Sequence, residues 1–202
     1  YQVLILEDNP YGDLRFAGEP VPAIKSLDEE GIVMYAGTFS KVISPGIRVG
    51  YAIGPKPVLQ KMIVCKQGED VHTGMLSQII CDEFMTHYDY DAHLAGLKGI
   101  YRKKSGIMLE QMEKHLRPLG IDWNPIEGGL FLWCTLPDGV DMPAFCKAAV
   151  LNKVCVVPGN AFLTDDTAPC QAFRINFSTP TDEAMEKGLE RLGGFAAEFL
   201  RR

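Results

Sequence analysis

One lysine stands shortly after a hydrophobic segment, with hydroxyl side chains before it and an arginine after it. The segment is Ile32–Ala36, and the polar sequence that follows contains Thr38, Ser40, Lys41 and, further on, Arg48. A lysine amine can form a Schiff base with a carbonyl group. An arginine beside hydroxyl groups is suited to bind a phosphate. Together these residues favour a ligand with both a carbonyl and a phosphate, although Lys41 taken alone is better explained as an ordinary loop lysine.

A carboxylate stands after an earlier hydrophobic segment, Tyr1–Leu6, in the sequence Glu7-Asp8-Asn9-Pro10-Tyr11. Pyridoxal phosphate carries a carbonyl, a phosphate and a ring nitrogen. Asp8 could pair with that nitrogen, and each charge would stabilise the other. Tyr11 could hydrogen-bond the ring oxygen. Taken alone, the Asp-Asn-Pro sequence is better explained as a turn signal.

Hydrophobic periodicity predicts the elements that position these residues. Continuous apolar runs over 1–6, 32–36 and 49–53 favour neighbouring strands of one sheet, buried on both faces as in parallel sheets flanked by helices. Helices are expected from Pro57, over about 75–87 and over about 92–116, and a loop with a short helix over 18–30.

The second half of the chain alternates strand and helix signals. Strands are expected over 129–136, 154–157 and 172–177, and helices over 142–151 and from Thr179 to the end. Thr179 is the expected N-cap of the last helix and Pro180 its first residue. We therefore predict two modules, with 1–90 part of an α/β parallel-sheet layer and 91–202 a smaller α+β unit led by a long helix.

Composition narrows the class of protein. The 202 residues include 20 basic and 26 acidic ones, a formal net charge of −6, and 47% are hydrophobic. This balance is that of an ordinary globular protein and argues against nucleic acid or an anionic membrane as a partner. No apolar run is long enough to cross a membrane.

The cysteines and histidines indicate neither a disulfide framework nor a metal site. Six cysteines lie in or beside apolar segments, and the four histidines have no metal-ligand spacing. The sequence therefore predicts buried free thiols, no bound metal and a reducing, cytoplasmic compartment.

Five segments, in order along the chain, resemble the fold-type I pyridoxal-phosphate enzymes, specifically the class I/II aminotransferases of the aminoadipate, kynurenine and aromatic type. They are EDNPYGDLRF (7–16), GTFSKVISPGIRVGY (37–51), EGGLFLW (127–133), PG (158–159) and FRINFS (173–178). The resemblance implies an α/β fold, comprising part of the parallel-sheet large domain and the smaller α+β C-terminal domain.

The resemblance also implies roles for single residues in cofactor binding. Lys41 matches the lysine that condenses with pyridoxal phosphate and then moves the substrate proton. Asp8 matches the partner of the ring nitrogen, and Tyr11 matches the residue that bonds the ring hydroxyl. Thr38 and Arg48 match the groups that bind the phosphate.

Two further residues complete the expected site. Ser40 stands beside the phosphate-binding residues. Arg174, in FRINFS, matches the arginine that binds the substrate α-carboxylate, a group for which a bidentate guanidinium is the natural partner. The implied activity is transfer of an α-amino group between an amino acid and a 2-oxo acid, and the family implies a homodimer.

The chain begins at Tyr1 rather than Met and is shorter than family members, so we expect it to be the C-terminal half of such an enzyme. Part of the expected phosphate and ring contacts cannot be located in it, and we expect little transaminase activity from it alone. Two alternatives remain open. One is the effector-sensing, aminotransferase-like domain of a transcription regulator, and the other is a pyridoxal-phosphate-dependent β-lyase.

Overall fold

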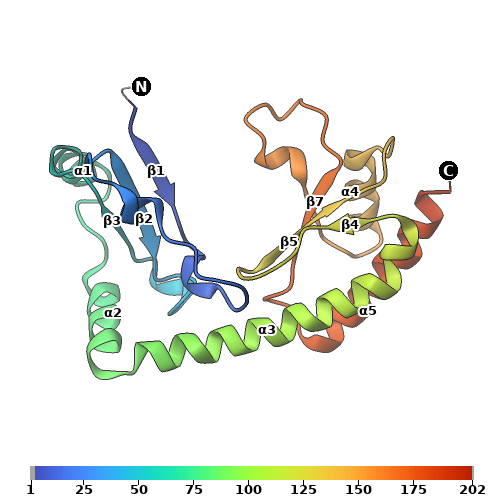
Figure 1. Ribbon diagram of the computed structural model, residues 1–202, viewed down its shortest axis with the longest axis horizontal. Coiled ribbons are helices and arrows are strands. Elements are labelled where there is room, and N and C mark those ends of the chain that lie inside the picture. The colour runs from blue at the N-terminus through green and yellow to red at the C-terminus, as the bar shows by residue number, and fades with distance from the viewer. Residues whose placement is uncertain (1–2, 202) are drawn as a thin grey trace. The chain divides into compact units, whose positions relative to one another are not determined.

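The computed structural model describes residues 3–201, and the chain forms two compact units, Tyr1–Lys98 and Gly99–Arg202 (Figure 1). The long helix α3 (Tyr90–His115) contributes residues to both.

Three neighbouring strands form the sheet of the first unit. They are β1 (Ile5–Asp8), β2 (Val33–Thr38) and β3 (Gly50–Ile53), in the order β1-β2-β3. The prediction of one sheet is confirmed, although Tyr1 and Gln2 of the first expected strand lie outside the described residues. β1 and β2 are parallel, whereas β3 is antiparallel to β2 and so differs from the expected parallel arrangement. The connection over 39–49 is too short for the crossover that a parallel neighbour needs.

Helices follow the sheet of the first unit close to their expected positions. They are α1 (Lys56–Glu69) and α2 (Met75–His87), and α3 begins at Tyr90. The short helix expected over 18–30 is the 3-10 helix η2 (Ile24–Leu27), whose first two backbone N–H groups donate to the carboxylate of Glu7 on β1. Further 3-10 turns are η1 (Gly12–Leu14) and η3 (Pro45–Ile47).

The expectation that the first strands are buried on both faces is wrong for β1 and for β3. Leu6 of β1 is 71% exposed, the four residues of β3 are all exposed, and α1 has no buried residue. A strand is buried on both faces only where other elements cover both sides of its sheet. The described elements of this unit leave several of these apolar side chains in contact with solvent.

The second unit contains an antiparallel sheet in the order β4-β5-β7-β6. The strands are β4 (Asp122–Trp123), β5 (Phe131–Thr135), β6 (Val157–Pro158) and β7 (Ala172–Asn176). β5 and β7 were expected, β6 begins at the end of the strand predicted over 154–157, and β4 was not predicted. The 3-10 helices η4 (Arg117–Leu119) and η5 (Gly159–Phe162) complete the connections.

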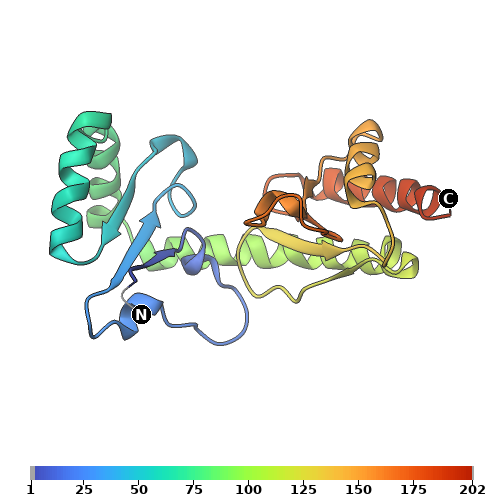
Figure 2. The ribbon, with the colours of Figure 1, turned by 90° about the horizontal axis from the view of Figure 1, so that it is seen from above.

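Helices α4 (Met142–Leu151) and α5 (Asp182–Phe199) pack against each other in this unit, and α4 packs against β6 and β7 of the sheet. In the views of Figures 1 and 2, α5 runs alongside the C-terminal part of α3, and Lys103 of α3 forms an ion pair with Asp182 of α5. Phe145 of α4 lies fully buried between Phe173 of β7 and Phe195 of α5, with ring centroids 5.5 and 5.1 Å away. This aromatic contact joins two helices to one face of the sheet.

The last helix begins later than the sequence predicts. Its N-cap is Thr181, whose hydroxyl accepts a hydrogen bond from the backbone N–H of Ala184, and Thr179 is not the cap. The backbone N–H of Thr179 instead donates to the side chain of Asn176, which forms a turn after β7. This turn delays the start of the helix.

Candidate active site

Two of the predicted site residues end neighbouring parallel strands. Asp8 is the last residue of β1 and Thr38 the last residue of β2, and Asp8 is in register with Ala36 of β2. The carboxyl ends of parallel strands lie at one edge of a sheet, where ligands of α/β proteins bind. Asp8 and Thr38 therefore lie at the same edge.

The turn after β2 brings the predicted phosphate-binding groups together. The backbone N–H of Ser40 donates to Thr38 Oγ1 over 3.1 Å, and Arg48 Nη1 donates to Ser40 Oγ over 3.1 Å. Arg48 adopts a left-handed conformation with φ of 54°, which is uncommon for a residue other than glycine. Hydrogen bonds thus connect the Thr38 hydroxyl, Ser40 and the Arg48 guanidinium within the segment that joins β2 to β3.

Lys41 lies beside Tyr11. Its Nζ atom is 5.9 Å from the centre of the Tyr11 ring, within range of a cation–π contact, and the lysine is half-buried. Tyr11 precedes η1, which follows β1 directly in sequence. The Lys41 amine, which follows β2, therefore lies near a residue that follows β1.

Sequence reasoning missed His93, which anchors the segment containing Lys41. Its Nε2 atom lies 2.6 Å from the backbone carbonyl of Val42, and because a carbonyl only accepts, Nε2 carries the donated proton. His93 belongs to the first turn of α3, and its ring contacts Phe84 edge-on at 5.0 Å. Nothing in the local sequence marks a contact between residues 51 positions apart.

Tyr51 of β3 also supports this edge of the sheet. Its ring lies over Gly37, where an added Cβ would come within 2.3 Å of Tyr51 Cζ, and it contacts Phe39 at 5.4 Å between centroids. Desolvation, followed by the neighbouring Tyr35 and Asp13, raises the pKa of Tyr51 to about 12. Gly37 leaves room for this ring, which the Cβ of any larger residue would displace.

The donor set at the strand ends fits pyridoxal phosphate. Thr38, Ser40 and Arg48 supply hydroxyl and guanidinium groups of the kind that bind phosphate, and Arg48 is exposed at the surface of the unit. An amine at Lys41 and a carboxylate at Asp8 belong to the same strand-end region. These groups match the aldehyde, ring nitrogen and phosphate of the cofactor.

Arg174 belongs to the second unit, on β7 opposite Trp133 of β5. Its Cζ atom lies 3.9 Å from the centre of the Phe131 ring and 4.6 Å from that of Phe162. Its Nε is buried and has no hydrogen-bond partner within residues 3–201. The guanidinium is therefore held by aromatic rings.

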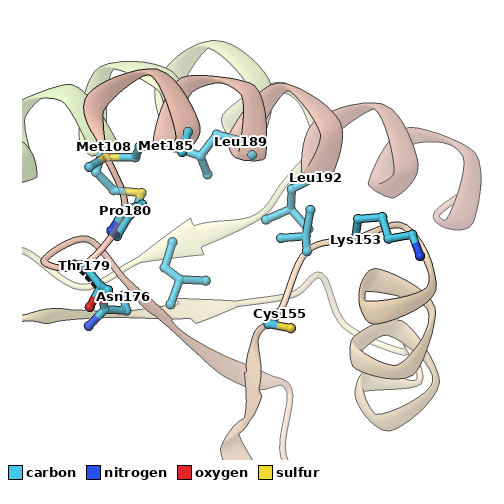
Figure 3. A pocket seen from close by; sticks show the side chains of 13 residues that line it. Met108, Lys153, Cys155, Asn176, Thr179, Pro180, Met185, Leu189 and Leu192 are labelled. Atoms are coloured by element: carbon cyan, nitrogen blue, oxygen red, sulfur yellow. Dashed lines mark hydrogen bonds between the residues drawn. The ribbon is translucent and has the colours of Figure 1, made fainter.

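A separate cavity of about 430 Å³ lies in the second unit and contains none of the predicted site residues (Figure 3). Apolar side chains of α5, including Met185, Leu189 and Leu192, line one side of it, and Lys153 and Cys155 lie at another.

The cysteines correct part of the sequence analysis. All six are free thiols, but Cys65 and Cys155 are exposed rather than buried, because Cys65 lies on the uncovered helix α1 and Cys155 lies beside the cavity. Within residues 3–201, no three metal-ligating side chains gather into a cluster. In the same part of the chain, no helix has the length and apolar character needed to span a membrane.

Comparison with known proteins identifies the family. The model of the aminotransferase class I and II family matches residues 1–192. An aromatic-amino-acid aminotransferase of Thermococcus litoralis is 37% identical over 202 residues, which is 100% of this chain and 48% of the relative. A helix-turn-helix transcriptional regulator of Bacillus subtilis, YisV, is 29% identical over 100% of this chain and 40% of its own length.

Solved structures agree with these sequence relationships. A multiple substrate aminotransferase from Thermococcus profundus has a TM-score of 0.93 and 36% identity, covering 100% of this chain and 50% of that one. The α-aminoadipate aminotransferase LysN of Thermus thermophilus, complexed with N-(5'-phosphopyridoxyl)-L-leucine, has a TM-score of 0.90 and 30% identity. The match covers 98% of this chain and 51% of that one.

The chain belongs to the class I and II aminotransferase family. Its predicted α/β fold class is confirmed by the likeness to solved aminotransferases. The chain spans about half the length of the curated relatives it matches.

Proposed function

We propose that this chain is the C-terminal part of a pyridoxal-phosphate-dependent aminotransferase, which moves an α-amino group between an amino acid and a 2-oxo acid. The observation that carries the proposal is the hydrogen-bonded set of Thr38, Ser40 and Arg48 in the turn that also contains Lys41. Membership of the family supports the same reaction.

Five residues besides Lys41 would hold the cofactor. Thr38, Ser40 and Arg48 would bind its phosphate, Asp8 would pair with its ring nitrogen, and Tyr11 would donate to its ring oxygen. When bound, the protonated pyridine ring supplies a sink for the electrons released at the substrate carbon.

The side chains of this chain would then bind the substrate and move one proton. Lys41 would hold the cofactor aldehyde through its amine and, once displaced by the substrate amine, act as the base at the substrate Cα. Arg174 would bind the α-carboxylate and so fix the direction of the Cα–H bond, an orientation effect worth several kcal/mol.

We also propose the wider organisation that the resemblance implies. Residues 1–90 would belong to the cofactor-binding large domain and 91–202 to the smaller domain, and the whole protein would be a homodimer. Six free thiols within the chain support a reducing compartment such as the cytoplasm.

Covalent trapping tests the central role of Lys41. The chain is incubated with less than one equivalent of pyridoxal phosphate and reduced with borohydride, and the labelled peptide is identified by mass spectrometry. We expect the label on Lys41, no such label in Lys41→Ala, and full labelling in the control Lys61→Ala, since Lys61 lies on the exposed helix α1. Labelling spread over surface lysines, unaffected by Lys41→Ala, would contradict the proposal.

A further inference from the structure

We propose that Phe131 and Phe162 are positioning residues, which orient the guanidinium of Arg174 without occupying its hydrogen-bond donors. The inference rests on the proposed role of Arg174 in binding a substrate carboxylate. It explains how an arginine can be held in one place and still have its N–H groups available for a ligand.

Both rings lie within cation–π distance of the guanidinium. Arg174 Cζ is 3.9 Å from the centre of Phe131 and 4.6 Å from that of Phe162, well inside the range of about 6 Å for this interaction. Phe131 lies two residues before Trp133, the cross-strand partner of Arg174, so Phe131, Trp133 and Arg174 share one face of the sheet. Phe162 comes from η5 and is supported by an edge-on contact with Trp133, with centroids 5.5 Å apart.

No protein carboxylate competes for this arginine in the described chain. Within residues 3–201 Arg174 forms no ion pair, and its buried Nε has no acceptor. Most buried polar groups of proteins are satisfied, so an arginine left in this state points to a ligand that supplies the acceptor. Aromatic faces attract the cation but accept no conventional hydrogen bond, and the terminal nitrogens remain free for the bidentate contact that a carboxylate favours.

The two rings are not required for the hydrophobic core. Phe162 is 47% exposed, and Phe131 lies on the sheet face opposite Leu132 and Cys134, which are almost completely buried. Phe162 can therefore be changed with little effect on the packing of the unit, which separates an orienting role from a structural one.

Nuclear magnetic resonance of the arginine side chains tests the orienting role. In the unmodified chain we expect the Hε resonance of Arg174 to be shifted by ring currents and the rotation about Nε–Cζ to be slow. Phe162→Leu should reduce the ring-current shift and speed the rotation about two- to fivefold, the factor that corresponds to one exposed cation–π contact. Phe162→Tyr keeps an aromatic ring and should preserve both signals, and the control Leu163→Ala should leave them unchanged.

Titration with sodium acetate, as the simplest carboxylate, tests the consequence for binding. The Arg174 signals should respond at about two- to fivefold lower acetate concentration in the unmodified and Phe162→Tyr chains than in Phe162→Leu. An Hε resonance that is the same in Phe162→Leu and the unmodified chain would overturn the positioning role. A ring-dependent Hε shift without any response to acetate would instead contradict the proposed substrate role of Arg174, so the two failures can be told apart.

Discussion

Replacing Gly37 with alanine places a methyl group where the ring of Tyr51 lies. The two residues are cross-strand partners of β2 and β3, and the new Cβ would come within 2.3 Å of Tyr51 Cζ and 2.6 Å of its hydroxyl oxygen. No real side chain tolerates such contacts, so the ring must move. Tyr51 is 40% exposed, which allows the ring to turn outward rather than push the strands apart.

The change in unfolding free energy follows from the aromatic contacts that the Tyr51 ring loses when it moves. Tyr51 lies 6.2 Å from Tyr35 and 5.4 Å from Phe39 between centroids, and an aromatic pair contributes about 0.5–1.5 kcal/mol beyond its buried area. Losing both costs about 1–3 kcal/mol. The lower entropy of the unfolded alanine chain offsets about 0.4–1 kcal/mol of this, which leaves a net destabilisation of about 1–2 kcal/mol.

Two measurements check the outcome. Urea unfolding should give a free energy about 1–2 kcal/mol lower for Gly37→Ala, while the control Gly46→Ala, whose nearest neighbour would be Ser44 Oγ at 3.9 Å, should be within about 0.5 kcal/mol of the unmodified chain. Absorbance titration should show the pKa of Tyr51 falling from about 12 toward its usual value of about 10, since desolvation is the main cause of the increase and the ring returns to water.

The same substitution should also weaken cofactor trapping at Lys41, because Gly37 immediately precedes Thr38 and the turn that contains the lysine. If Gly37→Ala unfolds at the same urea concentration as Gly46→Ala and Tyr51 titrates as before, the ring does not occupy this position and the reasoning is wrong.

Three further predictions concern other parts of the chain. Thr181→Ala removes the N-cap of α5 and should lower the unfolding free energy by about 1 kcal/mol in urea, whereas equal losses in Thr179→Ala would show that the cap is misassigned. Asp28 accepts hydrogen bonds from a lysine and two backbone N–H groups, which lower its pKa. Asp28→Asn should therefore lower the unfolding free energy at pH 7, and the gap between the variant and the unmodified chain should shrink as the pH falls below about 4. A gap that does not depend on pH would exclude this reasoning. Iodoacetamide at pH 8 should label the exposed Cys155 and leave Cys134 unmodified until the chain unfolds, because burial raises the pKa of the Cys134 thiol to about 12. Labelling of Cys134 in the folded chain would disprove that burial.

The sequence by itself determined most of the helices and longer strands, and the order of the chemical groups along the chain. Lys41 follows a hydrophobic run that forms β2, and Asp8 is the end of β1, so their positions at strand ends could be predicted from local patterns alone. The same holds for α2, which spans the residues that its apolar periodicity predicts. Such features depend on neighbours a few residues apart, and the printed sequence contains all of that information.

Only the tertiary structure decided which groups meet. The antiparallel direction of β3, the contact of His93 with Val42 and the aromatic rings around Arg174 each join segments that are distant in sequence. Their positions are set by the packing of whole elements, as Phe162 shows by reaching Arg174 from a 3-10 turn that has no hydrophobic period of its own. Local propensity fixes which residues end a strand, but the free energy of packing across the sheet fixes what each of them touches.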